Sequence, residues 1–473
     1  MARTTTRDLT QGSPMKLLLG FAFPLLGGFL FQQLYSFVDT LIVGVHLGYD
    51  KLGAVGSTGS LNFLINGFCM GICSGFSLPI AQAFGAKDET EMRRFVMHAV
   101  YLCAMISVAL GLLTGIFAPQ LLDMLGTIDA LRDDAIAYIR PIFFAIPATV
   151  MYNMASGVMR SLGDGRTPMI AIVIAALTNI ALDVLFMVHL GMGVEGAAYA
   201  TVISQLVSGL WCLLVIRRKF TVLRMEKEDL RWRAPFVRRL LNMGIPFGLQ
   251  YSITAIGSLT VTAAMNGIST EAVSAVTAAG KLSMLFCIVF DALASAIATF
   301  AGQNVGAKKL DRITEGLKAA SLVGCIYCVL AFVVLLFFGK DMVSLFVDAE
   351  DPAVITEVLN KAHHFLIVNS LMYIPLLFVN IMRFAIQGVG FTTVAMTAGV
   401  MELIGRAGVA ILLVPLFGYS AAVWANPVAW ILADAFLFPC YFTVMKWLRN
   451  RLLLTGQATQ SPKEYAANSK SVN

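Results

Sequence analysis

The chain contains twelve apolar stretches, each long enough to cross a lipid bilayer as a helix. About 20 apolar residues span the hydrocarbon core of a membrane. Hydrophobic residues make up 58% of the 473 positions and charged residues only 13%, whereas soluble domains carry about 25% charged residues. We therefore expect an all-α polytopic membrane protein. The stretches are centred within residues 17–45, 55–82, 95–117, 135–160, 167–189, 194–216, 240–265, 272–302, 313–338, 356–387, 393–416 and 420–447.

Lysine and arginine lie on one side of the predicted membrane. They gather within 3–16, 87–94, 160–166, 217–239, 308–312 and 446–451, whereas acids occupy alternate loops at 123–134 and 348–351. The positive-inside rule then places both termini in the cytoplasm. Because this asymmetry accounts for the net charge of +6, we interpret the charge as a topology signal and expect no nucleic-acid partner.

The two halves of the chain match at a displacement of 221 to 228 residues. Gln82 and Gly85 correspond to Gln303 and Gly306, and the prolines and glycines of later segments keep the same spacing. Six crossings per copy is an even number, so both copies enter the membrane from the same side, as in the parallel repeats of secondary transporters. We expect a first lobe at 1–220, a basic cytoplasmic linker at 221–238, a second lobe at 239–450, and a disordered cytoplasmic tail at 451–473.

Two aspartates, Asp39 and Asp183, lie inside apolar stretches, where a charge costs about 2.5 to 3.5 kcal/mol and indicates a functional site. Asn179 precedes Asp183 by one helical turn. Counted from the predicted outer helix ends, Asp39, Asp183 and Thr201 lie roughly 9 to 12 Å below the outer surface. These side chains form a candidate cation site in which two neighbouring carboxyl groups would share one proton or one sodium ion. A structural hydrogen-bonded pair is the alternative.

The second half lacks a matching acidic site. The repeat places Val261, Ile404, Gly408 and Asn426 at the corresponding positions, so coupling is expected to act on the first lobe alone. The second half has other intramembrane charges. Glu402 and Arg406 are spaced to pair on one helix face, and Lys281 can pair across helices with Asp434 or Asp291. Structural pairing is the favoured interpretation, with substrate recognition or a second proton relay left open.

Three segments carry a family resemblance: Pro24 to Gly44, Ile80 to Lys87 and Met159 to Pro168. Over residues 14–450 the chain resembles the multidrug and toxic compound extrusion (MATE) family. The resemblance implies twelve helices in two six-helix lobes around a central cavity, and export of drugs or metabolites driven by proton or sodium entry.

The resemblance also implies roles for single residues. The family's first-lobe cation site matches Asp39, Asn179, Asp183 and Thr201 position by position. Tyr35 and Asn153 match polar residues near that site, with ordinary interhelical hydrogen bonding as the alternative, and Gln32 is a further candidate for lining it.

Two features bear on the branch and on the mechanism. The NorM branch carries acids on helices seven and ten, where this chain has Gln250 and Asn369, so a DinF-like, first-lobe-coupled branch is expected. Pro24 removes a backbone hydrogen bond from the first helix and permits a bend. This bend is either a static kink or the protonation-linked bend proposed for the family.

The expected function is a proton- or sodium-coupled antiporter that exports drugs or toxic organic compounds, often cationic, by alternating access. We expect a monomer in a bacterial cytoplasmic membrane. A lipid-linked saccharide flippase or a metabolite exporter of the same superfamily is the alternative, although a flippase would be expected to have fourteen crossings. An ion channel fits the internal duplication less well. The sequence has no H-E-x-x-H motif, nucleophile–base pair or Walker A loop, so we expect no enzyme, no cofactor and no metal site.

Overall fold

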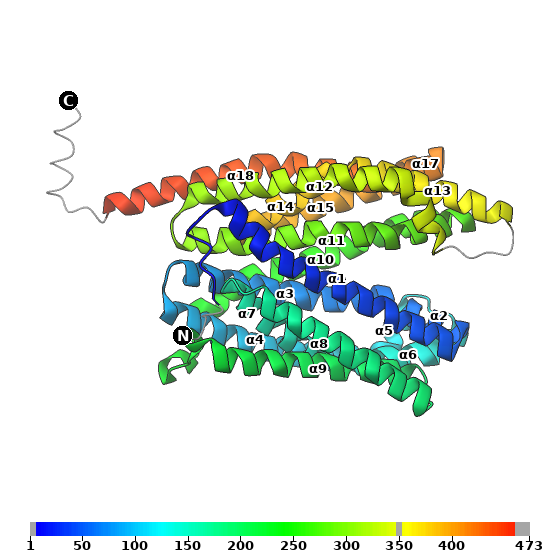
Figure 1. Cartoon of the computed structure of the whole chain (residues 1–473), viewed down its shortest axis with the longest axis horizontal. Helices are drawn as coiled ribbons and strands as arrows, with labels where there is room; N and C mark the ends of the chain where they lie inside the picture. The colour runs from blue at the N-terminus through cyan, green and yellow to red at the C-terminus, as the bar shows by residue number, and fades with distance from the viewer. Residues whose placement is uncertain (1–5, 347–351, 459–473) are drawn as a thin grey trace.

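The computed structural model describes residues 6–346 and 352–458, and within them the protein is a bundle of helices without strands. The helices of the first half fill the lower part of Figure 1 and those of the second half the upper part. The first half comprises α1 (Pro14–Leu47), α2 (Tyr49–Ser57), α3 (Gly59–Gly85), α4 (Glu89–Ile116), α5 (Ala118–Met124), α6 (Asp129–Phe144), α7 (Ile146–Ser161), α8 (Arg166–Asp183), η1 (Val184–His189) and α9 (Val194–Lys219).

A short linker with two 3₁₀ turns leads into the second half. These turns are η2 (Thr221–Leu223) and η3 (Lys227–Leu230). The second half comprises α10 (Ala234–Asn266), α11 (Thr270–Gly306), α12 (Leu310–Ser344), α13 (Pro352–Leu371), α14 (Tyr373–Gly388), α15 (Thr392–Gly408), η4 (Val409–Leu413), α16 (Val414–Phe417), α17 (Tyr419–Val423) and α18 (Ala425–Ala458).

The helices correspond to the twelve predicted crossings. Within the described residues, nine helical segments are long and apolar enough to span a membrane, and eleven are when the bent pairs α6–α7 and α13–α14 each count as one. The twelfth is α10, which is 33 residues long. Several hydroxyls lower its hydropathy, but Thr254, Ser258 and Thr262 each donate to a carbonyl one turn earlier in the same helix. Their polarity is therefore satisfied without water.

The duplication seen in the sequence is repeated in the irregularities of the helices. α8 ends at Asp183 before the π-helical turn η1, and α15 ends at Gly408 before the π-helical turn η4. The bend between α6 and α7 is 48° and that between α13 and α14 is 52°. Since helix defects of this kind mark corresponding places in both halves, they fix the register of the repeat near Asp183 at 408 − 183 = 225 residues.

The halves meet where α3 packs against α10. A Cβ added to Gly71 would lie 2.7 Å from the Cα of Gly248, and one added to Gly75 would lie 2.6 Å from the Cα of Gly244. Both helices thus carry a Gly-x-x-x-Gly pair, which lets two backbones approach closely in a membrane. α1 lies along both halves, because it packs on α8 and also on α11 and α12.

The end of the bundle that holds the linker, on the left in Figure 1, is called the linker end here. At this end the two repeat copies contact each other through equivalent residues. Gln82 Nε2 donates to the carbonyl of Gly388 at 2.9 Å, and Gln303 Nε2 donates to the carbonyl of Ser161 at 2.8 Å. A Cβ on Gly85 or on Gly306 would lie 1.9 Å from the partner glutamine's backbone oxygen. The ends of α3 and α11 are therefore in direct backbone contact.

The linker is fastened to α4 through one buried acid. Asp229 Oδ2 accepts from Arg93 Nε at 2.8 Å, and Asp229 Oδ1 lies 3.6 Å from Arg94 Nε. Burial alone would raise the pKa of Asp229, but the hydrogen bond from Arg93 and the neighbouring positive charges hold it below its usual value. The backbone N–H of Arg233 donates to His98 Nε2 at 2.8 Å and adds a second attachment.

Two expectations concern segments at the limits of the described residues. The acidic loop at 348–351 lies outside them. α18 continues to Ala458, which reaches into the segment expected as a tail, and residues 459–473 lie outside the described part of the chain.

Candidate functional site

The two intramembrane acids of the first half lie next to each other. Asp39 is on α1 and Asp183 is the last residue of α8, and these two helices pack along each other. The carboxyl groups face each other closely enough to interact directly. Asp183 is completely buried, whereas Asp39 is half-buried. The packing of α1 on α8 therefore brings together residues that are far apart in the sequence.

Polar side chains from three further helices or turns surround the acid pair. Asn179, one turn before Asp183, is completely buried. The Tyr35 hydroxyl points to the side chain of Gln205 on α9 and lies near Asp39. Tyr138 on α6 lies within electrostatic range of both acids.

Several oxygens of this cluster lack a hydrogen-bond donor. Asp39 Oδ1, both carboxyl oxygens of Asp183 and both polar atoms of the Asn179 side chain are buried and have no hydrogen-bond partner among the described residues. Leaving a buried polar group unsatisfied costs about 1 to 3 kcal/mol. Oxygens arranged in this way can bind a proton or a hard cation, because either one supplies the missing positive charge.

The remaining sequence-predicted residues of the first half are placed less centrally. Thr201 is half-buried on α9, one turn before Gln205. Asn153 donates to the carbonyl of Thr149 in its own helix at 2.8 Å. Gln32 is half-buried on α1. Pro24 is buried inside α1, which is assigned as one helix from Pro14 to Leu47.

The second half holds a buried ion cluster. Arg406 Nη2 donates to Glu402 Oε2 at 3.0 Å, and Arg383 Nη2 donates to the other oxygen, Glu402 Oε1. Asp434 lies within electrostatic range of Arg383. Asp291 lies near Tyr251 on α10.

The cross-helix pairing expected for Lys281 is not formed. Lys281 is exposed on α11, and none of the ion pairs among the described residues joins it to Asp291 or Asp434. The reason is that Arg383, on the facing helix α14, supplies the positive charge near Asp434 instead.

Four polar residues at these sites were missed by the sequence reasoning: Tyr138, Arg160, Gln205 and Arg383. Arg383 falls inside the predicted crossing 356–387, so the cost of an intramembrane charge could have singled it out. Gln205 is one turn beyond Thr201. Arg160, at the end of α7, reaches toward Tyr152 and Tyr251, although its place in the sequence indicated only a cytoplasmic loop.

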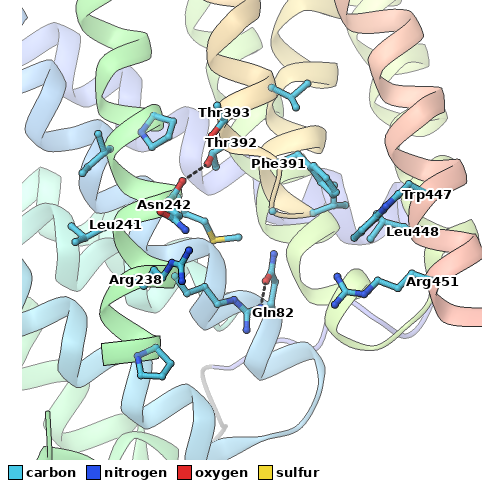
Figure 2. A pocket seen from close by; sticks show the side chains of 18 of the residues that line it. Gln82, Arg238, Leu241, Asn242, Phe391, Thr392, Thr393, Trp447, Leu448 and Arg451 are labelled. Carbon is cyan, nitrogen blue, oxygen red and sulfur yellow. Dashed lines mark hydrogen bonds between the residues drawn. The ribbon is translucent and has the colours of Figure 1, made fainter. Parts of the chain in front are cut away.

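A pocket of about 1260 Å³ opens at the linker end. Its walls are the first turns of α10 and α15 and the last turns of α18, and Gln82 of α3 lines it as well (Figure 2). Arg239 Nη2 donates to Gln82 Oε1 at 2.8 Å, which ties α10 to α3 at this pocket. Arg238, Arg239 and Arg451 give the pocket a basic lining.

The model of the MatE family matches the chain twice, at residues 24–185 and at residues 246–415. The chain belongs to the MatE family. Each match covers one copy of the internal repeat, so the family model and the helix irregularities agree on the duplication.

Named relatives of this MatE protein are bacterial. The probable multidrug resistance protein YoeA of Bacillus subtilis (strain 168) is 27% identical over 376 residues, which are 78% of this chain and 80% of the relative. The DNA damage-inducible protein F of Escherichia coli (strain K12) is 28% identical over 339 residues, or 70% of this chain and 72% of the relative. The family expected from the motifs is thus confirmed, and the second relative agrees with the expected DinF-like branch.

The fold is also that of solved MATE structures. A multidrug resistance MATE family transporter of the MOP superfamily in an outward-facing conformation superimposes with a TM-score of 0.87 at 21% identity, covering 95% of this chain and 99% of that one. This likeness confirms the predicted architecture of twelve transmembrane helices in two lobes. The MatE protein is therefore a multi-pass membrane protein.

Proposed function

We propose that this MatE protein is a cation-coupled antiporter that exports drugs or toxic organic compounds, often cationic, by alternating access. The observation that carries the proposal is the pair of facing carboxyl groups, Asp39 and Asp183, whose oxygens lack donors. Relatives named as multidrug resistance proteins support the class of substrate.

The acid pair accounts for coupling through charge. Two ionised carboxylates side by side repel each other in a medium of low dielectric constant. One proton or sodium ion removes that repulsion, so the helices α1 and α8 pack differently with and without it. Binding of the cation from one side of the membrane and its release on the other then favour opposite arrangements of the lobes.

The two lobes, residues 1–220 and 239–450, act as the moving bodies, and the basic linker at 221–238 tethers them. The linker end faces the cytoplasm, so both termini are cytoplasmic and the protein lies in a bacterial inner membrane. It works as a monomer, requires no cofactor, and catalyses no chemical conversion of its substrate.

Resistance of cells that express defined variants tests the assignment of the acid pair. Asp39→Asn and Asp183→Asn are each expected to abolish resistance to a cationic dye such as ethidium while the amount of protein in the membrane stays unchanged. Asp311→Asn is a matched control, because Asp311 is exposed and pairs only with Arg449 at the linker end. Full resistance in both acid-pair variants would refute the assignment.

A further inference from the structure

The second half has a counterpart of the acid site, and the repeat locates it. Asp183 and Gly408 each end a helix before a π-helical turn, with a displacement of 225 residues. The same displacement relates Thr201 to Asn426, since 426 − 201 = 225, and the displacement of 222 used for α1 relates Tyr35 to Gly257, since 257 − 35 = 222.

The side chain of Arg406 occupies this counterpart. Its Nε donates to Asn426 Oδ1 at 3.1 Å. Its Nη1 lies 3.3 Å from the point where a Cβ on Gly257 would stand. The guanidinium therefore lies between the equivalents of Thr201 and Tyr35, and a larger residue than glycine at position 257 would press on it.

The charges around Arg406 balance. Glu402 accepts from both Arg406 and Arg383, and Asp434 lies within range of Arg383. Arg383, Glu402 and Arg406 are each less than a tenth exposed. The cluster thus contains two positive and two negative side chains, all fixed to the protein.

We propose that Arg406 is a tethered cation that permanently fills the second-half counterpart of the coupling site. The second half therefore takes up no exchangeable cation, and each transport cycle moves only the cation that Asp39 and Asp183 bind. This inference rests on the proposed function of the acid pair.

The inference separates Arg406 from a residue that only fills space. Removing its charge while keeping its apolar stem leaves Glu402 and Asp434 facing Arg383 alone, with one negative charge unbalanced. A buried charge of that kind is neutralised by a proton or a small cation. Arg406→Met is thus expected to create a second cation site, whereas Arg406→Lys keeps the charge and creates none.

Cation binding by the full-length protein in lipid nanodiscs tests this. Proton uptake on passing from about pH 9 to about pH 5, where arginine does not titrate, and equilibrium binding of radioactive sodium are measured for each variant. We expect Asp39→Asn/Asp183→Asn to lose the one cation that the parent binds. Arg406→Met is expected to bind one more cation than the parent and to restore one cation in the Asp39→Asn/Asp183→Asn background, and Arg406→Lys to match the parent.

The outcomes distinguish the two proposals. Unchanged binding in Asp39→Asn/Asp183→Asn overturns the acid pair as the coupling site. A folded Arg406→Met protein that gains no cation overturns the tethered cation. If Arg406→Met does not fold, the parent decides: two cations of which Asp39→Asn/Asp183→Asn loses only one would contradict the inference, and a single cation that this double variant loses supports it.

Discussion

The polar residues around the acid pair come from several helices, and Tyr35 connects them. Its hydroxyl points to Gln205 on α9 and lies near Asp39 on its own helix. It can therefore hold the acid pair and α9 in one arrangement when the cation is bound.

Tyr35→Phe is expected to weaken cation binding without preventing transport. A lost hydrogen bond costs about 1 kcal/mol, so the cation concentration for half-maximal transport should rise about fivefold while the maximal rate changes little. Transport assayed over a range of cation concentrations measures both values. Tyr199→Phe, an exposed tyrosine on α9, serves as the control, and equal behaviour of the two variants would argue against a role for Tyr35.

Asp229 gives a prediction about pH. Its pKa is lowered by Arg93, so its stabilising contribution is complete above the ordinary carboxyl pKa of about 3.9 and is lost as the pH falls through the lower, folded-state value. Asp229→Asn should cost about 1.5 to 3 kcal/mol. The difference in melting temperature between this variant and the parent should stay constant from about pH 8 to about pH 5. A difference that disappears within that range would show that Asp229 is not held ionised.

At this scale the sequence predicts some residues well and misses others for a physical reason. Asp39 and Asp183 were predicted because an intramembrane carboxylate is costly wherever it points. Tyr138 and Gln205 were missed because tyrosine and glutamine are tolerated on many helix faces, and which face meets a neighbour depends on packing. Arg383 was missed as the partner of Glu402 because cross-helix pairing depends on helix rotation, which the spacing of residues along one helix does not give.

At the scale of elements, the contact between the ends of α3 and α11 closes the linker end. Gly85 and Gly306 permit this contact because a side chain on either would overlap the partner backbone. The N-terminal segment adds to it, since the N–H of Leu9 donates to Gln303 Oε1 at 2.8 Å and Lys309 Nζ donates to the carbonyl of Thr10 at 2.9 Å. Opening the linker end requires all these bonds to break together.

Gly306→Ala is therefore expected to open the linker end. The added methyl group cannot fit 1.9 Å from the backbone oxygen of Gln82, so the ends of α3 and α11 must separate. Hydrogen–deuterium exchange at Leu9 should rise at least about tenfold, which corresponds to about 1.4 kcal/mol. Gly280→Ala on the same helix, where an added Cβ meets nothing within 4 Å, should leave the exchange unchanged. Equal exchange in both variants would contradict a closing role for this contact.

Helix positions follow from hydropathy, but helix breaks do not. The predicted crossings 135–160 and 356–387 are each bent in two, at Ala145 and at Met372. Pro147 and Pro375 stand just after these breaks and explain why the hydrogen-bond ladder is interrupted there. The bend angles result from packing against neighbouring helices and could not be predicted from the prolines alone.

At the scale of the whole molecule, the two halves share one fold but carry different charges. The first half contains two acids without a fixed partner, and the second half contains two arginines that balance two acids. The duplication thus supplies two similar moving bodies, and the differences in charge assign cation exchange to one of them. The sequence predicted this inequality from the missing acids, although the arginine that replaces the cation became evident only from the packing.

Transport by purified protein in liposomes tests the central claim most directly. Dye transport is measured under an imposed proton gradient and, separately, under an imposed sodium gradient, for the parent and for Asp39→Asn. We predict that at least one gradient drives transport by the parent and that neither drives transport by Asp39→Asn. Gradient-driven transport by Asp39→Asn at the parent's rate, or no transport by the parent under either gradient, would contradict the account.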